Sequence, residues 1–145
     1  MIKISVQTAD FDTGAELAAL NAGDCGGVAS FTGIVRADGG LSALTLEHYP
    51  SMTERALAAL AEQAFERWSL LAVTLIHRVG RLVPGEQIVF VGTASAHRAA
   101  ALESCAYLID RLKTDAPFWK KEARSGGDTW VSAKASDDQA AARWQ

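Results

Sequence analysis

The sequence predicts a single α+β domain with mainly antiparallel strands, two long helices and β-hairpins. Short strand-like runs alternate with helix-like stretches, and turn sequences rich in glycine, aspartate and proline separate several of the strand-like runs. No linker, repeat or low-complexity tract divides the 145 residues, so we expect one domain over residues 1–145. A chain of this size buries roughly two thirds of the surface that its unfolded form exposes. It therefore needs no disulfide or metal to fold.

Composition and charge exclude several functional classes. Cys25 and Cys105 have no second cysteine or histidine at zinc-ligand spacing, so we expect reduced thiols, no bound metal and no other cofactor. Residues 1–7 lack the apolar core of a signal peptide, which predicts a cytoplasmic protein. No apolar run reaches the roughly 20 residues of a membrane helix, and the net charge of -3 argues against a nucleic-acid binder. Any anion site is therefore local.

The first two elements are a strand and a short helix. Residues 1–7 alternate apolar and polar side chains, which is typical of a strand. Asp12 and Thr13 can cap a helix that runs to about Asn21, and the glycine-rich residues 23–27 end it.

The next two elements are predicted to pair as a hairpin. Residues 28–36 are rich in β-branched and aromatic side chains, and residues 43–49 form a second strand-like run. Between them, residues 38–40 (Asp-Gly-Gly) supply a turn. This pairing would place Arg36 at the tip of the hairpin.

A long helix follows this hairpin. Ser51 and Glu54 have the spacing of a capping box, so the helix begins there, and we expect it to end near Ser69. One face repeats apolar residues at steps of three and four and is predicted to be buried. These residues are Leu57, Leu60, Ala61, Ala64 and Trp68.

A second hairpin is predicted from two further strand-like runs. Residues 73–79 and 87–93 are separated by a segment in which Pro84 and Gly85 suit the centre of a type II turn.

The last long helix leads into a proline corner. Ser95 can cap its start, and Pro117 biases Ala116 away from helical angles, so the helix ends there. Beyond the corner, residues 118–122 and 128–131 can pair as strands. The predicted apolar stripe of the helix is Leu102, Cys105, Ala106 and Ile109.

Two lysines bracket this corner. Lys113 is close in helical phase to Leu102 and Ile109, which places an amine on the otherwise buried side. Either Lys113 reaches solvent and complements the negative end of the helix dipole, or its amine faces a pocket as a base, acid or nucleophile. In an extended segment Lys120 and Lys121 point to opposite faces, so only one of them shares a site with Lys113.

The start of the last helix predicts an anion site. Free backbone donors and the helix dipole favour a bound anion there, and His97 and Arg98 add positive charge. The alternative is an exposed first turn, in which these cations oppose the dipole.

His48 and His77 are interpreted as packed or surface residues rather than ligands. No nucleophile elbow or carboxylate pair stands out, which leaves cationic chemistry on an anionic substrate.

Six short blocks, in order, resemble the catalytic large subunits of molybdopterin synthases, and the likeness covers nearly the whole chain. The resemblance implies the α/β-hammerhead fold of that family. The blocks are FTGIVR (31–36), LEHYP (46–50), IHRVG (76–80), SAHR (95–98), LKTDAPFWKKE (112–122) and GDTWV (127–131).

The resemblance also implies an activity, partners and an assembly. The family builds the dithiolene of molybdopterin by adding two sulfurs to cyclic pyranopterin monophosphate. A small ubiquitin-like subunit donates each sulfur from a thiocarboxylate on its C-terminal Gly-Gly tail. Two large subunits form a central homodimer with a small subunit at each end, a heterotetramer. We therefore expect a sulfurtransferase of molybdenum cofactor biosynthesis.

Site residues follow from the same resemblance. The family's essential lysines fall at Lys113 and Lys120, and its site lies at the dimer interface. Lys134 stands where relatives can have arginine, so it keeps the charge but loses the bidentate fork. The turn at residues 37–40 is shorter than in some relatives. The expected substrate-binding residues are Arg36, His97, Arg98 and Lys134.

Two other functions stay open at this point. The same cations would suit a non-catalytic module that binds a small protein's tail or a phosphorylated metabolite, and such a module would bind without forming a product. A structural α+β dimer with scattered surface lysines would bind no tail at all.

Overall fold

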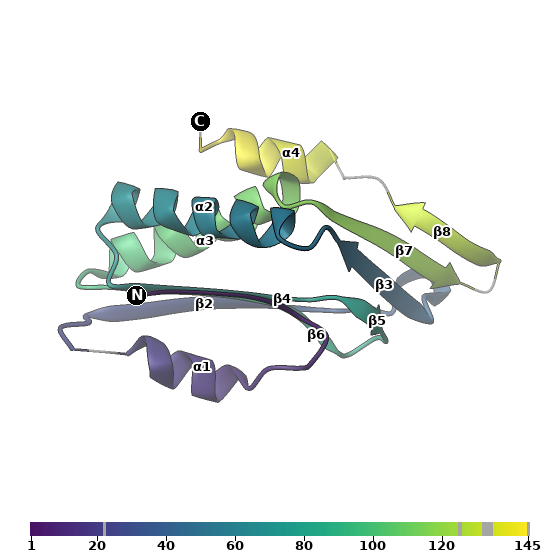
Figure 1. Ribbon diagram of the computed structural model, residues 1–145, viewed down its shortest axis with the longest axis horizontal. Helices are drawn as coiled ribbons and strands as arrows, with labels where there is room; N and C mark the ends of the chain where they lie inside the picture. The colour runs from purple at the N-terminus through teal and green to yellow at the C-terminus, as the bar shows by residue number, and fades with distance from the viewer. Residues whose placement is uncertain (22, 125, 132–134, 145) are drawn as a thin grey trace.

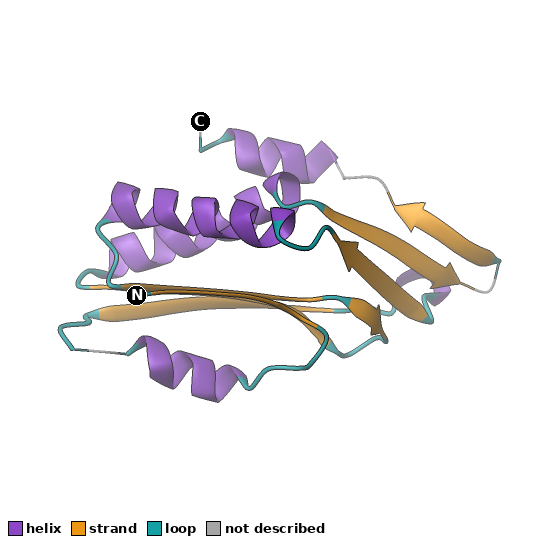
Figure 2. Ribbon diagram, in the orientation of Figure 1, coloured by secondary structure: helices purple, strands orange, loops and turns teal. Residues whose placement is uncertain are grey.

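The computed structural model consists of two four-stranded sheets and the helices that pack on them (Figures 1 and 2). It describes residues 1–145 except 22, 125, 132–134 and 145. The predicted α+β class, with mainly antiparallel strands and two long helices, is confirmed. Of the strand pairs that the structure describes, β1 and β4 alone run parallel.

The larger sheet has the strand order β1-β4-β6-β2. Its strands are β1 (Ile2–Gln7), β4 (Ala72–Arg78), β6 (Gln87–Ser95) and β2 (Gly27–Ile34). The long helices α2 (Met52–Trp68) and α3 (Arg98–Asp115) cover one face, and α1 (Thr13–Leu20) covers the other (Figure 1). Because both faces of the central strand β4 are covered, all seven of its residues are buried.

Two hydrophobic cores lie on the two faces of this sheet. Leu57 of α2 and Leu108 of α3 pack with Leu75 of β4 on the side of the long helices. On the other side, Leu20 of α1 packs against Phe90 of β6. All five side chains are fully buried, so these cores fix where the ends of α3 and β4 lie.

The smaller sheet has the order β5-β3-β7-β8 and extends beyond the long helices at one end of the molecule (Figure 1). Its strands are β5 (Gly80–Leu82), β3 (Ala43–His48), β7 (Phe118–Arg124) and β8 (Gly127–Val131). A third core, which includes Val35, Leu44, Leu46 and Leu82, forms on its inner face.

Several local predictions are confirmed. Asp12 caps α1 by accepting a hydrogen bond from the backbone N–H of Ala15 at 3.1 Å. In the turn after β5, Gly85 has φ +95° and the N–H of Glu86 donates to the carbonyl of Val83 at 3.1 Å, as a type II turn requires. β4 pairs antiparallel with β6, and β7 pairs with β8.

The predicted hairpin between residues 28–36 and 43–49 is wrong. β2 pairs with β6 along its whole length, whereas β3 belongs to the other sheet. The Asp-Gly-Gly segment is not a hairpin turn but a short 3-10 turn, η1 (Asp38–Gly40), in the connection between the two sheets. Arg36 therefore lies in a crossover and not at a hairpin tip.

Two predictions about α3 also need correction. Ser95 is the last residue of β6 and not the cap; His97 occupies the N-cap position, and its N–H donates to Oγ of Ser95 at 3.3 Å. Leu102, placed in the apolar stripe by periodicity, is 63% exposed. The face of α3 that the sheet and α2 bury is Ala101, Ser104, Cys105, Leu108 and Leu112.

The sequence also gave no indication of the C-terminal helix α4 (Ala135–Ala142). It lies beside α3, and Nε1 of Trp144 just beyond it donates to Oδ2 of Asp110 at 2.7 Å. Arg143 forms an ion pair with the same carboxylate at 2.8 Å.

No helix in the described parts of the chain is long and apolar enough to cross a membrane.

Candidate active site

Lys113 and Lys120 line the same small pocket, which we call the lysine pocket. The pocket has a volume of about 40 Å³, enough for a few water molecules. α3 contributes Lys113, β7 contributes Lys120, and β4 contributes His77. Leu112, Ala116 and Phe118 complete its walls. Both lysines are half-buried, so their amines are partly shielded from water at one place.

The proline corner brings the two lysines together. α3 ends at Asp115, and Ala116 has the extended angles φ -85° and ψ 129° that the residue before a proline prefers. The hydroxyl of Thr53, at the start of α2, donates to the carbonyl of Pro117 at 3.1 Å. β7 then begins at Phe118, five residues after Lys113, and runs antiparallel to β3.

Strand alternation decides which second lysine joins the pocket. Lys120 pairs with Leu46, which is 1% exposed, so Lys120 lies on the inner face of the smaller sheet. Lys121 points to the outer face, where its amine lies 3.5 Å from a carboxylate oxygen of Asp128 and 5.8 Å from the ring of Trp130. Lys121 is therefore excluded from the lysine pocket.

A larger pocket adjoins the first at Lys120. Its volume is about 330 Å³, and Arg36 and Arg124 line it together with Lys120. Nη2 of Arg36 lies 2.9 Å from Asp38, and Nη2 of Arg124 lies 2.9 Å from Glu122. Three cationic side chains and two carboxylates, those of Asp38 and Glu122, therefore line a cavity of the size of a small ligand, beside the pocket that holds Lys113.

Arg124 is a candidate that sequence reasoning missed. Its Nη1 donates to the carbonyls of Asp38 and of Gly39, the latter at 2.8 Å, so it holds the short turn that follows Arg36. Gly39 has φ +55°, and a Cβ there would lie 2.7 Å from Nη1 of Arg124. The signal was present in the sequence, because Arg124 lies four residues after Lys120 and therefore on the same face of β7.

His97 and Arg98 do not join this cluster within one chain. Both are exposed at the N-terminal end of α3, and Arg98 is about 22 Å from Lys113 along the helix axis at 1.5 Å per residue. Lys134, the remaining predicted substrate-binding residue, lies outside the described residues. The structure thus brings together Lys113, Lys120 and Arg36 near one end of α3.

His77 was expected to be a packed or surface residue, and it is buried, but in the wall of the lysine pocket. Burial is the main cause that lowers its pKa to about 3, and the charges of Lys113, Lys120 and His48 act in the same direction.

Burial also raises the pKa of the Cys105 thiol to about 11, which leaves it unreactive. Among the described residues, no group of His, Cys, Asp or Glu side chains could hold a metal ion.

Comparisons with known proteins identify relatives of the chain. The family model described as MoaE protein matches residues 6–115. A molybdopterin synthase catalytic subunit from Ralstonia nicotianae is 53% identical over 149 residues, which cover 99% of this chain and 85% of the relative.

Solved structures agree with these sequence matches. A molybdopterin cofactor biosynthesis protein E from Burkholderia multivorans superposes with a TM-score of 0.86 at 50% identity, over 99% of this chain and 97% of that chain. A protein–protein complex of subunits 1 and 2 of the molybdopterin-converting factor from Helicobacter pylori contains a chain of the same fold. That likeness has a TM-score of 0.75 at 21% identity and covers 92% of this chain and 91% of that one.

Proposed function

The chain belongs to the MoaE protein family, and we propose that it is the catalytic subunit of a molybdopterin synthase, a sulfurtransferase of molybdenum cofactor biosynthesis. The observation that carries this proposal is the convergence of Lys113 and Lys120 on one pocket, next to a larger pocket lined with arginine. The fold alone would not specify the chemistry, because one fold can host many activities.

The proposed reaction moves sulfur between two anionic partners. Sulfur passes from the C-terminal thiocarboxylate of a small ubiquitin-like subunit to cyclic pyranopterin monophosphate, and two such transfers form the dithiolene. A thiocarboxylate and a phosphate repel each other at close range. Arg36, Lys120 and Arg124 offset this repulsion from the walls of the larger pocket, whose volume suits a pterin.

The two lysines have different roles in this proposal. Lys113 acts at the reacting carbon or at the acyl sulfur, where it assists proton transfer or attack. Lys120 lines both pockets, so it contacts the bound substrate and stabilises the negative charge that develops during transfer. Arg36 binds the phosphate or the pterin from the crossover between the sheets.

His97 and Arg98 act on the same substrate from a second copy of the chain. Their distance from Lys113 along α3 supports a homodimer in which each site takes these two residues from the neighbouring protomer. β2 also supports a homodimer, because this edge strand exposes the apolar side chains of Val28, Phe31 and Ile34. Exposed apolar edges of this kind are commonly covered by another chain.

The sulfur donor binds as a small subunit at each end of the dimer, which completes a heterotetramer. The structure from H. pylori is a complex of two subunits, which supports a small-subunit partner for this family member as well. The thiocarboxylate at the end of the small subunit's Gly-Gly tail would reach the lysine pocket. Lys134 supplies a further positive charge to the tail or to the phosphate.

A reconstitution assay tests the proposed function. The purified chain is mixed with cyclic pyranopterin monophosphate and a small subunit that carries the thiocarboxylate, and the pterin products are identified by mass spectrometry. We expect the dithiolene product, and none when the small subunit ends in an ordinary carboxylate. Binding of the small subunit without any dithiolene would contradict the proposal and favour the non-catalytic binding module.

A further inference from the structure

The wall of the lysine pocket contains a third polar group, the imidazole of His77. The residue is 3% exposed and lies near the end of β4, so the larger sheet contributes it while the smaller sheet contributes Lys120. The mechanism proposed above does not use it. An inference about His77 rests on that proposed function, because it concerns the same pocket.

Contacts on two sides fix the orientation of the His77 ring. It stacks on Phe118 with ring centroids 3.8 Å apart and planes 20° apart. Nδ1 lies 2.9 Å from the carbonyl oxygen of Arg78. A carbonyl only accepts, so Nδ1 carries the hydrogen and Nε2 is left as an acceptor.

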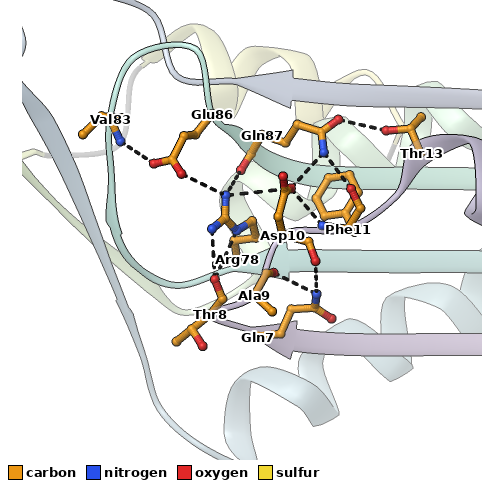
Figure 3. A network of polar contacts seen from close by, with 10 residues as sticks. All are labelled: Gln7, Thr8, Ala9, Asp10, Phe11, Thr13, Arg78, Val83, Glu86 and Gln87. Carbon is orange, nitrogen blue, oxygen red and sulfur yellow. Dashed lines mark hydrogen bonds and ion pairs between the residues drawn. The ribbon is translucent and has the colours of Figure 1, made fainter.

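Arg78, which supplies this carbonyl, is held in place by its side chain (Figure 3). The buried guanidinium of Arg78 donates to the carbonyl of Thr8 at 3.0 and 3.2 Å and to the carbonyl of Gln87 at 3.1 Å. Two carboxylates, those of Asp10 and Glu86 in Figure 3, lie 3.9 and 3.8 Å from its Nη1. This network holds Arg78 at the end of β4, and the carbonyl that Nδ1 of His77 faces belongs to this residue.

The His77 ring is neutral at physiological pH. Burial is the main cause of its low pKa, and the groups that face it are Lys113 from α3, Lys120 from β7 and His48 from β3. Because the His77 ring is neutral, it does not repel the ammonium groups of Lys113 and Lys120. Of the described residues that line the pocket, the two lysines supply the side-chain donors, because Leu112, Ala116 and Phe118 have none.

We propose that His77 is a positioning residue for sulfur transfer: Nε2 of its neutral ring accepts a hydrogen bond from Nζ of Lys113 and orients that group toward the substrate. Lys113 is the donor because it lines this pocket alone, whereas Lys120 also lines the larger pocket and serves the substrate there. His77 thus acts through Lys113 and makes no contact with the substrate itself.

The reconstituted assay with three variants tests this role. His77→Phe keeps a flat ring against Phe118 but removes both nitrogens, and His77→Gln restores a polar acceptor. His48→Phe is the matched control, because His48 lies on β3, 6.5 Å from the Phe118 ring, and does not line the lysine pocket. All variants are first checked for thermal unfolding and for binding of the small subunit.

We expect His77→Phe to lower kcat by about 10- to 100-fold, the range of one hydrogen bond to a charged group, with KM for the pterin within about twofold. The limb of the kcat–pH profile that reports the Lys113 ammonium moves to lower pH, because the ammonium form loses its acceptor. His77→Gln recovers part of the rate, and His48→Phe stays close to wild type.

The possible failures are distinguishable. If the wild-type chain makes no dithiolene, the proposed function fails. If the wild type is active and His77→Phe has the same kcat and the same pH profile, the positioning role fails.

Nitrogen NMR of the wild-type ring tests the role without relying on a folded His77 variant. We expect a hydrogen on Nδ1, a bare Nε2, and a larger shift of the Nε2 resonance in Lys113→Ala than in Lys120→Ala. A hydrogen on Nε2 would overturn the proposal.

Discussion

At the scale of single residues, the alternation of β7 separates two adjacent lysines into different environments. Lys120 faces inward toward both pockets, and Lys121 faces outward toward Asp128 and Trp130. Alternation in the sequence predicted that only one of them could join Lys113, but not which one; Lys120 was named by the family resemblance alone. That choice depends on which face of the smaller sheet is buried, and a face is set by partners distant in the sequence.

Arg124 provides a prediction at this scale. Arg124→Ala releases the turn at Asp38 and Gly39 and removes a cation from the larger pocket. We expect KM for cyclic pyranopterin monophosphate to rise about 10-fold with kcat changed less than about threefold, because the lost contacts serve binding. Arg124→Lys should recover little, since one ammonium cannot hold the turn carbonyls and the Glu122 carboxylate at once, as Nη1 and Nη2 do.

Arg81→Ala is the control for Arg124. Arg81 is an exposed arginine on β5 of the same sheet, so its loss changes the net charge equally and leaves the larger pocket intact. Equal KM values for wild type and Arg124→Ala in the reconstituted assay would show that Arg124 does not serve the site.

At the scale of elements, the corner between α3 and β7 depends on α2. The hydroxyl of Thr53 donates to the carbonyl of Pro117 at 3.1 Å and accepts from the N–H of Tyr49 at 3.2 Å. Thr53 is fully buried, so it joins the end of β3, the start of α2 and the corner without help from water. The separation of Lys113 and Lys120 is set by this corner.

Replacing this hydroxyl gives a prediction for stability. Thr53→Val keeps the shape but leaves buried backbone groups without their partner, so we expect the free energy of unfolding in urea to fall by about 1–3 kcal/mol. Thr45→Val, at a half-buried position on β3, should change it by less than about 0.5 kcal/mol. Equal stability of Thr53→Val and wild type would show that the corner does not depend on this side chain.

Elements were predictable where their signals are local. The long helix α2, the type II turn with Gly85 and the strand pair β7–β8 follow from capping, turn and alternation patterns. The hairpin between residues 28–36 and 43–49 failed because an Asp-Gly-Gly turn is local, whereas β2 pairs with β6, more than 50 residues away. The prediction that Leu102 is buried was wrong, because periodicity gives the spacing of an apolar stripe but not which side of the helix faces the sheet.

At the scale of the whole molecule, the site forms from segments that are far apart in the sequence. Lys113 and Lys120 were predicted from their motif and from family resemblance. His77 was set aside, because a histidine in a strand gives no sign of the pocket that the fold builds around it. His97 and Arg98 were assigned to a site at a dimer interface, without any indication of which protomer supplies them, and α3 separates them from Lys113 within one chain.

The buried His77 also makes the stability of the whole chain depend on pH. Its pKa is about 3 in the folded state and 6.5 for an exposed histidine, as in the unfolded chain. Between these pH values the unfolded state therefore binds a proton and the folded state does not. Stability is therefore full above pH 6.5 and falls as the pH drops toward 3. Between pH 7 and pH 5 the loss from this group is about 2 kcal/mol at 1.36 kcal/mol per unit.

Urea unfolding at pH 7 and pH 5 measures this effect. Carboxylates titrate in both proteins, so the difference between wild type and His77→Phe isolates the histidine. We expect the wild type to lose about 2 kcal/mol more than the variant over this range. An equal loss in the two proteins would show that His77 is not buried in its neutral form.

We propose that Lys113 performs sulfur transfer in the pocket it shares with Lys120. The most direct test of this claim is the single-turnover rate of sulfur transfer from a thiocarboxylated small subunit to cyclic pyranopterin monophosphate, measured for wild type, Lys113→Ala and Lys121→Ala. We predict at least about a 100-fold loss for Lys113→Ala, typical for a missing acid–base group, and less than about threefold for the outward-facing Lys121→Ala. A folded Lys113→Ala that binds the small subunit and transfers sulfur at the wild-type rate would contradict the claim.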